Sequence, residues 1–145
     1  MNHQIRAITF IMALSLCILP SCSTSEKTKD DATETVLETT RAEPFTRDIY
    51  DKLLVADAHG SVPAREVFLV TVTITNVKAN RENGRTDISL TGTLWAGSKV
   101  EGKFVFGESG FDYVAARKPG EVVTLKCQFN DISSATVDFI GALPE

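Results

Sequence analysis

Few side chains in this sequence carry groups that could do catalytic chemistry. The 145 residues include two histidines, and His3 lies in an N-terminal segment that is expected to be removed. His59 could act as a lone general base, or it could be a loop residue after a helix, which is the preferred interpretation. One histidine supports neither a two-histidine metal site nor a Ser-His-Asp arrangement. We therefore expect that the protein is not an enzyme and that it has no catalytic residue, no metal site and no cofactor.

The first 21 residues have the features of a secretory signal peptide. Arg6 supplies a positive charge, and residues 7–19 (AITFIMALSLCIL) form an uncharged apolar run of 13 residues. A membrane-spanning helix needs about 20 such residues. The run is therefore too short for a stable transmembrane anchor and is typical of an export signal.

The segment LPSC, residues 19–22, ends this apolar run. Leu19 stands three positions before Cys22, and the small residue Ser21 directly precedes it. The segment resembles the lipobox of bacterial lipoproteins, although Pro20 departs from the commonest residue at its position. The resemblance implies cleavage after Ser21, with diacylglycerol on the Cys22 sulfur and usually a third acyl chain on the new amine. Two or three acyl chains give durable membrane anchoring.

The resemblance also predicts where the protein is located. Ser23 is not Asp, which in Gram-negative lipoproteins implies export to the outer membrane, here facing the periplasm. The alternative is an ordinary secretory signal cut near Ser21, Ser23 or Ser25, which would leave Cys22 as an incidental thiol. Cys17 leaves with the signal, so Cys127 has no partner for an intramolecular disulfide.

Composition divides the remainder into a tether and a folded part. Residues 22–42 are rich in Ser, Thr, Asp, Glu and Lys, so this segment is expected to be a flexible tether. The formal net charge of -4 and the pI of about 5.2 argue against a nucleic-acid partner. Residues 43–145 are expected to form one domain.

The periodicity of the domain predicts a helix followed by five strands. Residues 43–57 have helical spacing, with Pro44 at a first helical position and an apolar stripe of Phe45, Ile49, Leu53 and Ala56. Strands are predicted at residues 67–77, 86–95, 99–106, 121–129 and 135–143, with a short helix at 111–118. Asn83 and Gly84 predict a hairpin turn between the first two strands. The expected inward residues include Phe68, Val70, Val72, Ile74, Ile88, Leu90, Leu94, Val100, Gly102, Phe104, Phe106, Val123, Leu125, Cys127, Phe129, Val137, Phe139 and Leu143.

This order of elements is typical of the OB-fold, a five-stranded Greek-key barrel with a helix between its third and fourth strands. An immunoglobulin-like sandwich is the alternative, but that fold has about seven strands. The segments VTVTITNV, GKFVF and PGEVVTLKCQF resemble the tRNA_anti-like group of small bacterial OB-fold proteins. The resemblance covers residues 43–145 and implies the fold. The nucleic-acid binding of related barrels is not carried over, because the outward residues of the second and third strands include one aromatic residue and mixed charges.

The OB-fold ligand surface suggests where a partner would bind. Trp95 ends the second strand, and Arg81 and Arg85 lie in the loop before it, so these three form the candidate ligand surface. Alternatively, Trp95 packs beneath the first helix. We expect a lipid-anchored binding or scaffold module that recognises an envelope protein or a glycan. The alternative function is inhibition of a host or competitor hydrolase by a rigid loop at residues 81–85.

Overall fold

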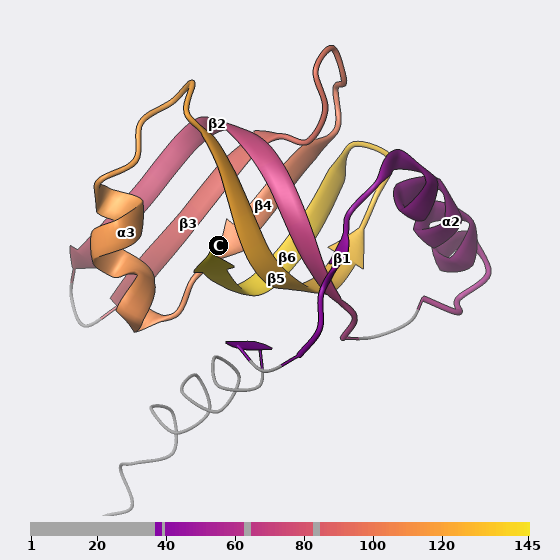
Figure 1. Cartoon of the computed structure of the whole chain (residues 1–145), viewed down its shortest axis with the longest axis horizontal. Helices are drawn as coiled ribbons and strands as arrows, with labels where there is room; N and C mark the ends of the chain where they lie inside the picture. The colour runs from indigo at the N-terminus through magenta and orange to yellow at the C-terminus, as the bar shows by residue number, and fades with distance from the viewer. Residues whose placement is uncertain (1–36, 39, 63–64, 83–84) are drawn as a thin grey trace, which may run out of the picture.

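The computed structural model describes residues 37–38, 40–62, 65–82 and 85–145 (Figure 1). The predicted signal peptide, Cys22 and the predicted tether up to residue 36 lie outside this part of the chain. Asn83 and Gly84 of the predicted hairpin turn also lie outside it, but Glu82 pairs with Arg85 across that position. The two strands therefore pair as expected, but they are longer than predicted, so Arg81 lies in β2 (Val67–Glu82) and Arg85 in β3 (Arg85–Thr93) and not in a loop.

The described chain is rich in strands, as predicted. Its strands are β1 (Glu43–Pro44), β2 (Val67–Glu82), β3 (Arg85–Thr93), β4 (Glu101–Val105), β5 (Val122–Ile132) and β6 (Thr136–Pro144). They form one mixed sheet in the order β1-β2-β3-β4-β6-β5, in which β1–β2 and β4–β6 are parallel. β5 also pairs with β2, so the sheet curves back on itself and is partly ring-like (Figure 1).

Alternating side chains fill the inside of this curved sheet. The inward residues of β2 and β5 are buried as predicted, from Phe68 to Ile74 and from Val123 to Phe129. The rings of Phe104 and Phe139 stack at the centre, 5.1 Å apart. Gly92 lets β3 approach β2 closely, since a Cβ there would lie 2.4 Å from the Thr73 carbonyl oxygen. Period-two alternation thus correctly predicted most of the core.

The last strand departs from its predicted pattern. Leu143 was expected inward, but Ala142 is 2% exposed and takes the inward position, while Leu143 is only half-buried. The register with β5 shifts beside Gly141, whose φ is +61°. An irregularity of this kind adds one residue to a strand and exchanges its two faces beyond that point. The prediction for Leu143 was therefore wrong.

The first helix, α2 (Arg47–Ala58), starts later than predicted. Pro44 lies in β1 instead of at a first helical position, and Thr46 caps the helix by accepting a hydrogen bond from the Ile49 backbone N–H at 3.4 Å. Tyr50 is buried with Leu53, although it was not on the predicted stripe, and Phe45 is buried from the segment before the helix. α2 covers one end of the curved sheet (Figure 1).

A shorter helical segment covers the other end. After β4 the chain forms a 3-10 turn, η1 (Glu108–Gly110), that leads directly into α3 (Phe111–Ala115). Val114 is fully buried, Phe111 is half-buried and Ala115 is exposed, so the predicted apolar face is correct only in part. α3 packs against β2 and β3 at the end of the sheet opposite α2 (Figure 1).

Candidate functional site

Trp95 lies at the contact between α2 and the sheet. Its indole stacks on Phe45, with ring centroids 6.0 Å apart, and meets the edge of Tyr50 at 5.5 Å. The Tyr50 hydroxyl donates to the carbonyl oxygens of Ser133 at 3.3 Å and Ser134 at 3.0 Å. These contacts leave Trp95 half-buried, in the packed arrangement that the sequence left open as an alternative.

The two predicted arginines lie far from Trp95. Arg85 and Thr93 are the two ends of β3, and eight residue steps of about 3.3 Å place them roughly 26 Å apart. The Arg81 guanidinium lies over the ring of Phe111 in α3, at 3.9 Å. The structure therefore does not bring Trp95, Arg81 and Arg85 together on one surface.

The two side chains with possible chemistry are separate as well. His59 is exposed and follows α2, where its backbone N–H donates to the Ala56 carbonyl at 3.1 Å. Cys127 is fully buried, with its sulfur 3.8 Å from the Phe68 carbonyl oxygen, and this burial raises the pKa of the thiol strongly. Within the described part of the chain, no group of three or more His, Cys, Asp and Glu residues could hold a metal ion.

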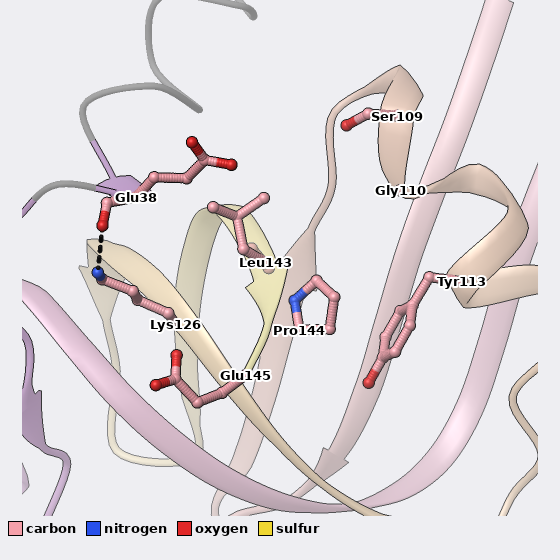
Figure 2. A pocket seen from close by; sticks show the side chains of 9 residues that line it. Glu38, Ser109, Gly110, Tyr113, Lys126, Leu143, Pro144 and Glu145 are labelled. Carbon is pink, nitrogen blue, oxygen red and sulfur yellow. Dashed lines mark hydrogen bonds between the residues drawn. The ribbon is translucent and has the colours of Figure 1, made fainter.

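A pocket that the sequence did not predict opens where β4 separates from β6. β4 pairs with β6 as far as Phe104 and Phe139, and the chain then turns away into η1. β6 continues to Pro144, and the space between its end and η1–α3 has a volume of about 490 Å³ (Figure 2). This size falls in the usual range for small-ligand sites. The pocket is lined by Glu38, Ser109, Gly110, Tyr113, Lys126, Ala142, Leu143, Pro144 and Glu145.

One wall of the pocket carries charges of both signs. Lys126 of β5 donates from Nζ to the backbone carbonyl of Glu38 at 3.0 Å. Figure 2 shows the Glu38 and Glu145 carboxylates on the same side of the pocket as this ammonium group. The wall therefore combines one cation, which already donates to a carbonyl oxygen, with two carboxylates.

The opposite wall is formed by Tyr113. Its side chain reaches from α3 toward the end of β6, as Figure 2 shows. Arg117 lies over the ring at 4.7 Å, donates to the Tyr113 carbonyl oxygen and pairs with Glu121 at 3.3 Å. Burial raises the pKa of the Tyr113 hydroxyl, an effect that the Arg117 cation partly opposes. The hydroxyl is thus neutral at physiological pH and can both donate and accept a hydrogen bond.

Two residues near the end of the predicted tether make contacts in the structure. Leu37 is 1% exposed, and the backbone carbonyl of Glu38 accepts the hydrogen bond from Lys126. Leu37 and Glu38 belong to the segment that was predicted as a tether, and the domain boundary at residue 43 stays a prediction. Among the described residues no helix is long and apolar enough to cross a membrane.

The comparisons with known proteins return no relative. No known protein family matches the chain, and neither a curated protein nor a solved structure resembles it significantly.

Proposed function

We propose that the folded part is an OB-fold domain. The ring of pairings runs β2-β3-β4-β6-β5 and returns to β2, and α3 lies between β4 and β5 in the chain. Counted without the two-residue β1, this is the order of a five-stranded Greek-key barrel with a helix after its third strand. The parallel β4–β6 pair, which joins the third and fifth of these strands, supports the same topology.

The protein is a lipid-anchored module of the cell envelope in this proposal. Cys22, in the LPSC segment, carries the acyl chains, and Ser23 directs the protein to the outer membrane, facing the periplasm. The polar segment after Cys22 separates the domain from the lipid surface. The membrane is thus the first partner, reached through Cys22.

Within the envelope the domain binds a partner, an envelope protein or a glycan, and does not catalyse a reaction. The pocket between β6 and η1–α3 supports the binding function, because its lining combines charged groups of both signs with the apolar side chains of Leu143 and Pro144. Such a lining orients a ligand through a few polar contacts. Participation of Arg81 and Arg85, at the α3 end of β2 and β3, stays a prediction.

Crosslinking in intact cells, followed by purification of the tagged full chain, tests this function. A binding module should recover an envelope component of the same cell, and Tyr113→Ala should reduce the recovery about tenfold. Thr71→Ala, on the exposed face of β2, is the matched control and should have no effect. Recovery of a hydrolase from another organism would favour the inhibitor function instead, and recovery of nothing would contradict both.

A further inference from the structure

The pocket between β6 and η1–α3 holds charges of both signs that are not paired with one another. Among the described residues, neither the Glu38 nor the Glu145 carboxylate has a cation within ion-pair distance. The Lys126 ammonium donates to the Glu38 backbone carbonyl at 3.0 Å and makes no other hydrogen bond within the described part of the chain. An ammonium group has three N–H donors, so two of them remain for a ligand.

Arg117, the second cation near the pocket, does not add to this free charge. Its guanidinium pairs with Glu121 at 3.3 Å and lies over the Tyr113 ring at 4.7 Å. The pair is neutral as a whole and supports the ring from behind. The Tyr113 hydroxyl is neutral too, so it can donate to an anion or accept from a cation.

The size and the charges of the pocket together indicate which ligand fits. Its volume of about 490 Å³ suits a small molecule. Figure 2 shows Leu143 and Pro144 between the charged wall and the Tyr113 side chain, so the middle of the pocket offers apolar contact. A purely cationic ligand would meet the Lys126 ammonium, and a purely anionic ligand would meet two carboxylates. Because juxtaposed like charges are unfavourable, a ligand that carries both signs fits best.

We propose that the pocket binds a small zwitterion, whose ammonium group lies against the Glu38 and Glu145 carboxylates and whose anionic group accepts from Lys126. This inference rests on the proposed binding function and names the chemical group that the pocket recognises, either free or displayed on an envelope component. A dipeptide with free termini and the ethanolamine headgroup of a lipid share this chemistry. The apolar part of either ligand contacts Leu143, Pro144 and the Tyr113 ring.

An NMR titration of the full chain in uncharged maltoside micelles tests the inference. The probes are dialanine, its N-acetylated form, its C-terminal amide and glycerophosphoethanolamine. Dialanine should bind, and each capped form should bind at least about threefold more weakly, because it has lost one of the two charges. Tighter binding of dialanine than of glycerophosphoethanolamine would identify a peptide as the source of the zwitterion, and the reverse order would identify a headgroup.

Charge variants assign the two contacts. In Glu38→Gln combined with Glu145→Gln, N-acetylation should no longer weaken binding, because the carboxylates that meet the ammonium group are gone. In Lys126→Gln, amidation should no longer weaken binding. Glu101→Gln and Lys103→Gln, both exposed on β4, are the matched controls and should retain both losses.

Equal binding of dialanine and its two capped forms would overturn the inference, as would chemical-shift changes confined to residues outside the pocket lining. If neither zwitterion binds while crosslinking still recovers an envelope partner, the zwitterion inference fails and the proposed function stands.

Discussion

The ring of Phe45 lies parallel to the indole of Trp95, with centroids 6.0 Å apart and an angle of 16° between the planes. Phe45 also meets Phe68 and Phe139 edge-on, at 5.2 and 5.3 Å. A residue just before α2 therefore connects the core of the sheet with the loop after β3. Trp95 is in this way a packing residue that fixes one end of the domain.

Truncation of Trp95 should destabilise the domain. Full removal of a buried Trp or Phe side chain costs about 3–5 kcal/mol, and because Trp95 is half-buried we expect Trp95→Ala to cost about 2 kcal/mol. Trp95→Phe, which keeps an aromatic ring against Phe45, should cost less than half as much. Urea unfolding measures both, and an unchanged midpoint for Trp95→Ala would show that the stacking contributes nothing.

Gly92 should not tolerate a side chain. A Cβ there would lie 2.4 Å from the Thr73 carbonyl oxygen and 2.5 Å from a methyl group of Val72, so β3 would have to move away from β2. We expect Gly92→Ala to cost about 1–3 kcal/mol, the range for overpacked sites. Thr93→Ala, at the next residue, is the control and should cost less than about 1 kcal/mol. Equal thermal midpoints for these two variants would argue against the close approach.

Cys127 should react with alkylating reagents only when the protein unfolds. Burial raises the pKa of its thiol, so the folded protein keeps the unreactive neutral form. Because the raised pKa favours the neutral thiol in the folded protein, the free energy of unfolding depends on pH. It is unaffected by this thiol below the unfolded pKa of about 9 and falls as the pH rises above that value, by up to about 1.4 kcal/mol per pH unit.

Two measurements check the prediction for Cys127. Native protein should label at least a hundredfold more slowly than protein in urea, and Cys127→Ala should remove the excess loss of stability between pH 9 and pH 10. Rapid labelling of the native protein would place the thiol at the surface.

Lipid labelling should depend on Cys22 and not on Cys127. In cells given a radioactive fatty acid, Cys22→Ala should abolish labelling and leave uncleaved or soluble protein, because the acceptor sulfur is gone. Cys127→Ser keeps Cys22 and should label like the wild type. Equal labelling of the Cys22 variant and the wild type would contradict the lipoprotein interpretation.

Sequence patterns predicted what depends on local alternation and missed what depends on tertiary contact. The inward residues of β2 and β5 follow from a period of two, since each strand buries one face. The exchange of Leu143 for Ala142 was missed because Gly141 adds one residue without a change in hydrophobic pattern. Tyr50 was missed because its role depends on Ser133 and Ser134, 83 and 84 residues away in sequence.

The pocket could not be predicted for the same reason. It exists because β6 is longer than its pairing with β4, and no local signal reports that difference. The Glu38 contact with Lys126 joins residues 88 apart in sequence, and it lies in a segment whose polar composition predicted a tether. The strand-rich class, by contrast, was evident from the β-branched alternation alone.

Site-specific photocrosslinking from the pocket tests the central claim, that this is an envelope binding module, most directly. Tyr113→p-benzoylphenylalanine places a photoreactive ring in the pocket of the full chain in living cells, and Thr71→p-benzoylphenylalanine places the same group on the exposed face of β2. The account predicts a discrete adduct with an envelope component from position 113 and none from position 71. No adduct from position 113, or the same adducts from both positions, would contradict it.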